Sequence, residues 1–282
     1  MADSNYFNGG VAVITGGASG LGASMARRFF SQGMRVAILD INGEKAEETA
    51  SGMSSDGTKA IGIQVDVANV EAIQLAAQTV EEKFGECSVL CANVGVQQFG
   101  AIDKLTLNDW QWIINVNVMG VVHTINTFLP LVRKSKKPRH IVITASSAAY
   151  SPGVRMGAYT SSKYAITGYG ETLRMELADE EIGVSLLFPA GMSTTHIESS
   201  IKARPSDLGA SVVRREDIDA MKASRNTDCE GQVGTADYAT RYLLRELTEN
   251  RRYIITHGND ETAITSHYND LLEAHKRAQK TH

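Results

Sequence analysis

Cysteine is scarce in this sequence of 282 residues, which contains only Cys87, Cys91 and Cys229. Three cysteines do not make a disulfide framework, and neither a CxxC pair nor a cysteine–histidine spacing indicates a metal site. Cys87 and Cys91 flank an apolar run, so we expect them to be buried free thiols. The scarcity therefore predicts no bound metal and favours a reducing compartment, the cytoplasm.

A strong charge of one sign and long apolar runs are also lacking. The net charge is −4, which predicts neither a nucleic acid nor an anionic membrane surface as a partner. No apolar run approaches the length of a membrane span. Residues 1–8 are polar, without a basic region before an apolar run, so we expect no secretory signal. Hydrophobic residues make up 43% of the chain, enough to bury a large core.

Apolar runs typical of buried strands alternate with amphipathic stretches typical of helices. The expected strands are Val11–Thr15, Arg35–Asp40, Ala60–Val67, Ser88–Asn93, Arg139–Ser146, Val184–Pro189 and Arg252–His257. Several of these runs are continuously apolar, as expected for parallel strands that are covered on both faces. Right-handed crossovers then predict one α/β domain over residues 1–282, a doubly wound, seven-stranded Rossmann sheet between layers of helices.

The expected helices fill most of the chain between these strands. They are Leu21–Gln32, Glu44–Gly52, Val70–Phe84, a long apolar helix over 106–133 opened by a capping box, Gly157–Asp179 and Thr235–Glu249. Residues 192–232 lack clear periodicity and are predicted to be an irregular substrate loop or lid. The helical tail at 258–282 exceeds the minimal fold. A solvated helix and a cover over an active site, its own or a neighbour's, are equally open for it.

A glycine-rich turn, TGGASGLG at 15–22, lies between the first strand and the first helix. Glycines let the backbone approach a pyrophosphate, and the helix N-terminus offers free N–H groups and a positive dipole. Such a turn often serves packing alone, but its place in a repeated strand–helix pattern favours a dinucleotide site. The expected cofactor contacts in the turn are Gly16, Ser19, Gly20, Leu21 and Gly22.

Asp40 ends the second expected strand, where a carboxylate can accept hydrogen bonds from both adenosine ribose hydroxyls and would repel a 2′-phosphate. No arginine follows at Ile41 or Asn42, and Ser19 stands where a basic residue would favour that phosphate. These residues predict NAD rather than NADP as the cofactor, with a solvated strand-end aspartate as the alternative. Further cofactor contacts are expected at the same crevice from Ile41, Asp66, Val67, Asn93 and Gly95.

Tyr159 and Lys163 lie four residues apart on an expected helix, and this spacing places them on one face. A tyrosine has an ordinary pKa of about 10, and a base near neutrality needs that pKa lowered by ~3 units, which a nearby ammonium favours. The spacing alone also fits a surface pair. However, Ser146 ends the fifth expected strand at the same crevice, where its hydroxyl could donate to a substrate oxygen.

Several short motifs between about residues 10 and 257 carry a family resemblance. They are TGGASGLG at 15–22, Asp40, Asp66-Val67, Asn93-Val94-Gly95, Asn117, Ser146, Tyr159 with Lys163, and Pro189–Thr194. As a set they resemble the short-chain dehydrogenase/reductase superfamily in its compact, single-domain branch. Three local departures are Ala92-Asn93-Val94-Gly95 for the usual Asn-Asn-Ala-Gly, Pro189-Ala190-Gly191 for Pro-Gly, and a second serine, Ser147, beside Ser146. We choose Ser146 because the ungapped family spacing favours it.

The resemblance implies a role for each matched residue. Tyr159 would be the general acid/base, Lys163 would bind the nicotinamide ribose and lower the tyrosine pKa, and Ser146 would orient the carbonyl. Asn117 would hold a water in a proton relay. Pro189, Gly191 and Thr194 would contact the nicotinamide end of the cofactor. The implied activity is NAD(H)-dependent hydride transfer between nicotinamide and a secondary alcohol or ketone; a catalytically silent NAD-binding sensor or scaffold is the alternative.

Family geometry also suggests where a substrate and a second subunit would bind. The expected substrate contacts are Gln97, Ser147, Tyr150, Met192 and His196. Their mixture of apolar and polar groups favours a medium-sized hydrophobic or aromatic alcohol. Residues 95–130 and 189–204 resemble family members that oxidise the Cα alcohol of lignin-derived aryl ethers. The helices at 107–133 and 157–179 form the usual subunit interface of the family, which implies a homodimer or homotetramer.

Overall fold

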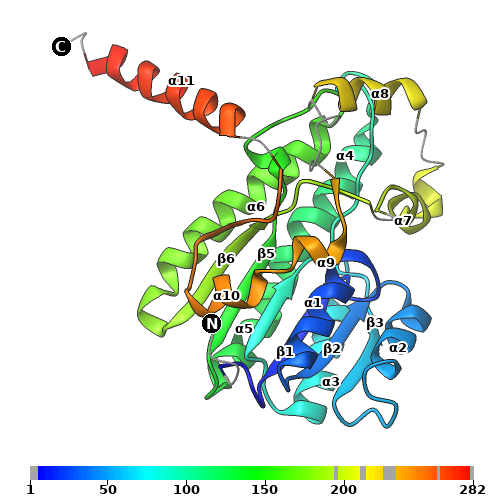
Figure 1. Ribbon diagram of the computed structural model, residues 1–282. Coiled ribbons are helices and arrows are strands. Elements are labelled where there is room, and N and C mark those ends of the chain that lie inside the picture. The colour runs from blue at the N-terminus through cyan, green and yellow to red at the C-terminus, as the bar shows by residue number, and fades with distance from the viewer. Residues whose placement is uncertain (1–5, 194–195, 210–213, 225–232, 259–260, 280–282) are drawn as a thin grey trace.

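Seven parallel strands form the centre of the molecule (Figure 1). The computed structural model describes residues 6–193, 196–209, 214–224, 233–258 and 261–279. In spatial order the strands are β3 (Ala60–Gln64), β2 (Arg35–Asp40), β1 (Val11–Thr15), β4 (Val89–Ala92), β5 (Arg139–Thr144), β6 (Ile182–Phe188) and β9 (Tyr253–Ile255). This order confirms the predicted Rossmann sheet. The strand order reverses at β1, which pairs with both β2 and β4, and ligands of such sheets bind beside that point.

Side chains that alternate along β1 reach two different hydrophobic cores. Val11 and Val13 pack into one core, and Ala12 and Ile14 pack into the other. Such alternation is the period of a strand covered on both faces. The first core is closed by α3 (Val70–Phe84), α5 (Gly120–Lys134) and α6 (Gly157–Glu176), and the second by α1 (Gly20–Ser31), α2 (Gly43–Ser51) and α10 (Leu243–Thr248). Cys87 and Cys91 are buried free thiols, as predicted, and Cys229 lies outside the described residues.

The long helix predicted over 106–133 is confirmed in extent but contains an irregularity. It begins at α4 (Leu107–Ile114) with the predicted Thr106–Asp109 capping box, passes through a π-helical turn at Asn115–Met119, and continues as α5. By length and apolar composition alone Leu107–Lys134 could cross a membrane, which corrects the expectation of no such run. Half of its most apolar window is buried inside the protein, where α5 packs on α3 and β4. Core helices of soluble proteins share these properties.

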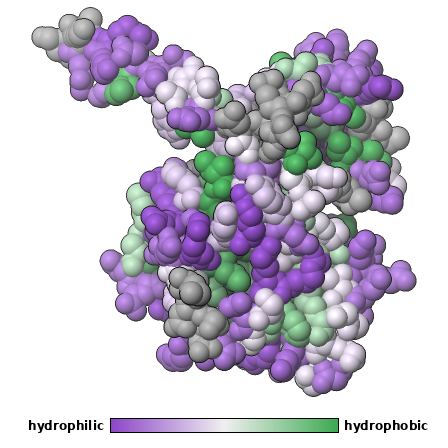
Figure 2. Space-filling view, in the orientation of Figure 1, coloured by the Kyte–Doolittle hydropathy of each residue, from purple (hydrophilic) through white to green (hydrophobic). Residues whose placement is uncertain are grey.

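The segment predicted to be an irregular loop, 192–232, is largely helical where it is described, so that prediction was wrong. It contains α7 (His196–Ala203) and α8 (Arg215–Ser224), and two-residue strands at its ends, β7 (Gly191–Met192) and β8 (Val233–Gly234), pair with each other. The two helices are short and polar, so their sequence lacks a strong apolar stripe. Figure 1 places α7 and α8 above the sheet, and Figure 2 shows this upper part as a cap of mixed hydrophilic and hydrophobic residues.

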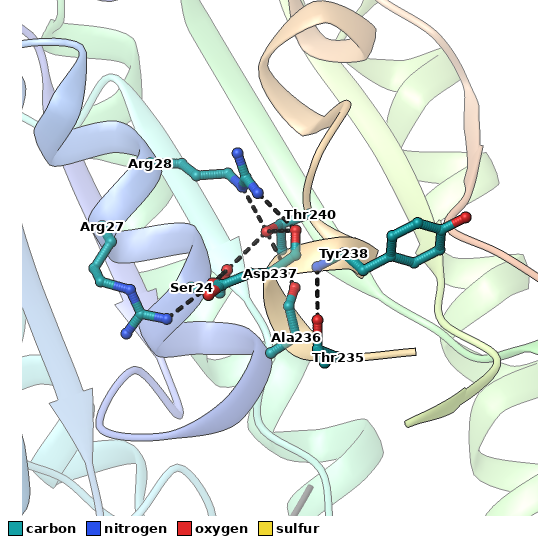
Figure 3. Close-up of polar contacts among 8 residues, drawn as sticks. All are labelled: Ser24, Arg27, Arg28, Thr235, Ala236, Asp237, Tyr238 and Thr240. Carbon is teal, nitrogen blue, oxygen red and sulfur yellow. Dashed lines mark hydrogen bonds and ion pairs between the residues drawn. The ribbon is translucent and has the colours of Figure 1, made fainter. Parts of the chain in front are cut away.

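The helix predicted over Thr235–Glu249 is divided into α9 (Ala236–Ala239) and α10, and a polar network holds α9 on α1 (Figure 3). Ser24 Oγ donates to Asp237 at 2.6 Å, and Arg28 Nε donates to Thr240 Oγ1 at 2.6 Å. Arg27 forms an ion pair with Asp237 at 2.9 Å. The network anchors α9, which follows β8 along the chain, to the helix that follows the glycine-rich turn.

The C-terminal tail forms a separate helix, α11 (Glu261–Gln279), that projects from the body (Figure 1). None of its described residues is buried. Its first half touches the body, where Ile264 packs against the core and the His267 ring lies 6.5 Å from the Tyr164 ring. None of the described residues of the helix is among those that line the cavity described below, and a cover over its own active site stays a prediction. A cover over a neighbouring subunit stays a prediction.

Candidate active site

A cavity of about 820 Å³ runs along the carboxyl ends of the strands, from the glycine-rich turn to the cap formed by α7 and α8. Every predicted cofactor-binding residue lines it, except Thr194, which lies outside the described residues. Of the predicted catalytic residues, Ser146, Tyr159 and Lys163 line it and Asn117 lies behind its wall. The fold thus brings the two halves of the predicted site into one space.

The glycine-rich turn has the backbone that its sequence predicts. Gly16 and Gly20 have φ angles of +64° and +49°, in the region that favours glycine. A Cβ on Gly22 would lie 2.1 Å from the Gly16 carbonyl oxygen, so no other residue fits where α1 begins. Ser19 caps α1 without a side-chain hydrogen bond to the helix. The turn therefore presents a helix N-terminus and a side-chain hydroxyl to this end of the cavity.

Asp40 lies at the cavity with each of its carboxylate oxygens held by the backbone. Oδ2 accepts from Ala18 N–H at 3.2 Å and Oδ1 accepts from Asn42 N–H at 3.0 Å. Each oxygen keeps further acceptor capacity, because a carboxylate has about four lone-pair sites. No arginine is among the described residues that line the cavity. This end fits the two hydroxyls of an adenosine ribose and does not fit a 2′-phosphate.

Asn93 joins the ends of three neighbouring strands. Its Nδ2 donates to the carbonyl oxygens of Thr15 and Gly16 at 3.2 and 3.3 Å, and its Oδ1 accepts from Thr144 Oγ1 at 3.0 Å. Thr15 Oγ1 in turn accepts from Asn93 N–H at 3.0 Å. The two threonines were missed by the sequence analysis, although Thr15 ends a predicted strand and Thr144 lies two residues before the predicted end of another. Asn93 therefore fixes the floor of the cavity as well as lining it.

Lys163 is buried between α6 and the end of β5. Its ammonium donates to the Thr144 carbonyl at 2.9 Å and lies 5.5 Å from the centre of the Tyr159 ring. Burial lowers the pKa of Lys163 to about 7. Ser146 Oγ accepts a hydrogen bond from Ala148 N–H at 3.1 Å. Its own O–H group can still donate a hydrogen bond into the cavity. A cation, a phenol and a hydroxyl donor thus share one wall.

Asn117 is fully buried in the π-helical turn, and its side chain bonds to protein groups rather than lining the cavity. Its amide bonds to the backbone of Val96 and donates to Ser162 Oγ at 3.0 Å. Its described hydrogen bonds all go to protein groups, and its predicted role of holding a water in a proton relay stays a prediction. A π turn inside a helix often marks a functional position.

Four of the five predicted substrate residues, Gln97, Ser147, Met192 and His196, line the cavity. Tyr150 does not, because its ring packs in the core 5.6 Å from that of Phe188. The His196 ring lies 6.4 Å from that of Tyr159. Burial, with a smaller contribution from the charge of Lys163, lowers the pKa of His196 to about 4, so the imidazole is neutral near pH 7.

Ile197 and Met221 fall in the predicted substrate segment 192–232, but the sequence analysis missed the rest of an apolar wall around Tyr159. Phe99 and Met156 pack with the Tyr159 ring in a small core, against which Ile197 and Met221 also pack. All of them line the cavity, as does Trp112 of α4. Phe99, Met156 and Trp112 carry no motif, and Ile197 of α7 and Met221 of α8 reach the wall only because these helices fold over the sheet.

Comparisons with known proteins agree with this geometry. The family model described as short chain dehydrogenase matches residues 10–205. The C alpha-dehydrogenase of Sphingobium sp. strain SYK-6 is 31% identical over 95% of this chain and 87% of its own. The (-)-trans-carveol dehydrogenase of Rhodococcus erythropolis is 26% identical over 87% and 93%.

Among solved structures, a short-chain dehydrogenase/reductase from Burkholderia phymatum in complex with NAD superposes with a TM-score of 0.86. It is 32% identical, with 95% of this chain and 96% of that chain covered. The protein therefore belongs to the short-chain dehydrogenase family.

Proposed function

We propose that this oxidoreductase uses NAD(H) and interconverts a secondary alcohol, medium-sized and hydrophobic or aromatic, with its ketone. The observation that carries the proposal is the continuous cavity between Asp40 and Tyr159. At one end it offers a carboxylate for a ribose, and at the other a phenol beside a cation and a hydroxyl donor. Bound between these ends, the nicotinamide supplies or accepts the hydride.

The carboxylate of Asp40 supports NAD over NADP. A 2′-phosphate at this place would meet its negative charge, and Asp66 adds a second carboxylate to the same end of the cavity. Two lysines are among the described residues that line the cavity, and neither lies at the Asp40 end. Lys163 lies beside Tyr159, and Lys222 lies on α8 in the cap. The NAD complex of the similar Burkholderia phymatum protein agrees with this assignment.

Tyr159 takes the proton from the alcohol, or returns it to the ketone, in this proposal. Ser146 donates a hydrogen bond to the same substrate oxygen and stabilises the charge that develops there. The ammonium form of Lys163 favours the phenolate of Tyr159 by Coulomb attraction. Because the pKa of Lys163 is about 7, its amine can also exchange protons near neutrality.

The apolar wall around Tyr159 supports a hydrophobic or aromatic substrate. Methionine side chains adapt their shape and make favourable contacts with aromatic rings, and Met156, Met192 and Met221 all line the cavity beside Phe99 and Trp112. A neutral His196 adds one polar group to this wall. Similarity to the Sphingobium C alpha-dehydrogenase makes arylpropanols the first class to test.

The proposed activity is tested by following NADH formation with a panel of secondary alcohols, in parallel with NADP⁺. The panel includes aliphatic, alicyclic, steroidal and arylpropanol members. We expect turnover with NAD⁺, greatest for one hydrophobic or aromatic class. Tight NADH binding without turnover of any alcohol would instead favour a non-catalytic NAD sensor.

We also propose that the protein is a homodimer or homotetramer. Large hydrophobic side chains lie exposed on the helices that the family resemblance assigns to the interface, Leu107 and Met119 on the long helix and Tyr164 and Met175 on α6. Light scattering after gel filtration tests the proposal. A monomer at micromolar concentration would contradict it.

A further inference from the structure

The most buried ion pair among the described residues lies behind the substrate end of the cavity. Arg204 Nη2 is 2.7 Å from Asp109 Oδ1, and the two side chains are only 5% and 12% exposed. In each other described ion pair at least one partner is 33% exposed or more. Exposed pairs contribute little, whereas a buried pair fixes its two partners firmly in place.

Each partner of this pair is held by its own segment. The Arg204 Nε donates to the Gly209 carbonyl at 2.8 Å, and Nη2 donates to the Leu208 carbonyl at 3.1 Å. The second oxygen of Asp109 accepts from the backbone and the hydroxyl of Thr106, both at 2.8 Å, in the cap of α4. The pair therefore joins the chain after α7 rigidly to the first turn of α4.

The residues around the pair form the substrate wall. Ala203 and Pro205, on either side of Arg204, line the cavity. Trp112, which also lines it, has its ring centre 5.3 Å from the Arg204 guanidinium carbon. In the middle of α7, Ser200 Oγ accepts from Gln97 N–H at 3.0 Å, and at the start of the helix His196 lies beside Tyr159. The position of the whole of α7 relative to Tyr159 thus depends on these two attachments.

The arrangement is poorly suited to stability alone. The Arg204 Nη1 is buried without a hydrogen-bond partner among the described residues, and an unmet buried donor is unfavourable. A hydrophobic pair of similar volume would often be at least as stable as a buried ion pair. The charged pair instead fixes the relative orientation of its two side chains, because a planar guanidinium binds a carboxylate well in only a few geometries.

We propose that Arg204 and Asp109 are positioning residues for substrate specificity: their ion pair sets the distance between α7 and α4, and so the width of the substrate end of the cavity. Neither residue lines the cavity, so both act through Ala203, Pro205 and Trp112. The proposal rests on the proposed function in taking this end of the cavity as the substrate site. The proposal predicts no change in cofactor binding at the other end of the cavity.

Hydrogen–deuterium exchange of the NADH-bound protein tests the attachment without any substrate. Asp109→Asn keeps the size of the side chain and an oxygen for the α4 cap, but removes its charge. We expect faster exchange in the peptide 196–209 and unchanged exchange in β1, β4 and β5. Asp219→Asn, which breaks the exposed pair with Arg215 on α8, is the matched control. No change in 196–209, or equal acceleration throughout the sheet, would overturn the proposal.

Steady-state kinetics tests the effect on specificity once an alcohol is turned over. We expect Asp109→Asn and Arg204→Met to raise KM for the alcohol by about fivefold or more, with smaller changes in kcat, and with NADH affinity within about twofold. Arg204→Lys keeps the charge without the planar fork and should recover part of the loss. An unchanged KM in the presence of faster exchange would show a purely structural pair and overturn the proposal. Faster exchange in a protein that oxidises no alcohol would support the attachment and count against the proposed function.

Discussion

The side-chain amide of Asn117 holds both backbone polar groups of Val96. Its oxygen accepts from Val96 N–H at 2.8 Å, and its nitrogen donates to the Val96 carbonyl at 2.9 Å. Val96 lines the cavity just after β4, and the same nitrogen reaches Ser162 on the helix that carries Tyr159. One buried amide therefore sets the relative positions of β4, the long helix and α6.

Replacing this amide should loosen the site as well as the fold. Asn117→Ala leaves the Val96 N–H and carbonyl unpaired in a buried place, so we expect a loss of about 2–4 kcal/mol in the free energy of unfolding. Asn126→Ala, at an exposed position on α5, is the matched control and should have little effect. Urea denaturation followed by circular dichroism measures both. Equal stability of the two variants would show that the hydrogen bonds to Val96 are dispensable.

The glycine-rich turn should tolerate no side chain at Gly22. A Cβ there would meet the Gly16 carbonyl oxygen at 2.1 Å, which forces the backbone of the turn to move. We expect Gly22→Ala to weaken NADH binding by about tenfold or more, because the helix N-terminus moves away from the phosphates. Gly168→Ala, where an added Cβ meets nothing within 4 Å, should leave binding unchanged. NADH fluorescence titration measures both, and equal affinities would contradict this account of the turn.

The choice of NAD should depend on Asp40. We expect Asp40→Ala to narrow the preference for NAD over NADP by about tenfold or more, through loss of the ribose hydrogen bonds and of the repulsion toward a 2′-phosphate. Glu44→Ala removes an exposed carboxylate on the neighbouring helix α2 and should not alter the preference. Titration with NADH and NADPH measures the ratio of affinities. An unchanged ratio in Asp40→Ala would mean that another group excludes the phosphate.

Acid should destabilise the protein through buried neutral histidines. Burial, with a smaller effect of Arg174, lowers the pKa of His140 to about 3, and the ring nitrogen Nε2 lies 2.8 Å from Ser185 Oγ. In the unfolded chain this imidazole takes up a proton near pH 6.5, whereas in the folded protein it stays neutral down to about pH 3. The contribution of the neutral His140 to the free energy of unfolding is therefore fully present above pH 6.5 and is lost as the pH falls toward 3. For His140 alone the loss between pH 8 and pH 5 is about 2 kcal/mol.

Chemical denaturation at the two pH values measures this loss. His196, whose pKa is lowered to about 4, adds to the loss in the same direction. His140→Gln removes the titrating group, so the variant should lose less stability on acidification than the original protein. A pH dependence identical in both proteins would show that His140 is not the source.

The sequence was sufficient to predict the elements that follow a simple period. The bounds of β1, β2 and α3 agree with the prediction, because continuous apolar strands and a well-capped amphipathic helix carry strong local signals. Tyr159, Lys163 and Ser146 were also predicted to meet, since their spacing places them at one edge of a parallel sheet.

Other features depend on contacts between distant residues and could not be predicted. The π turn at Asn115–Met119 changes the helical hydrogen-bond pattern without changing the apolar pattern. The polar helices α7 and α8 are held over the cavity by contacts such as Arg204 with Asp109, which lie 95 positions apart. Tyr150 was expected in the substrate site from the geometry of the family, but the turn after β5 directs its ring into the core.

The central claim, that Tyr159 is the acid/base of an NAD-dependent alcohol oxidoreductase, is tested most directly by Tyr159→Phe. The substitution removes one hydroxyl from a buried ring and leaves the packing with Phe99 and Met156 in place. We predict that turnover of the best alcohol falls by about a thousandfold or more, while NADH affinity stays within about twofold. Substantial turnover in the variant, at unchanged NADH affinity, would contradict the account and assign the proton transfer to another group.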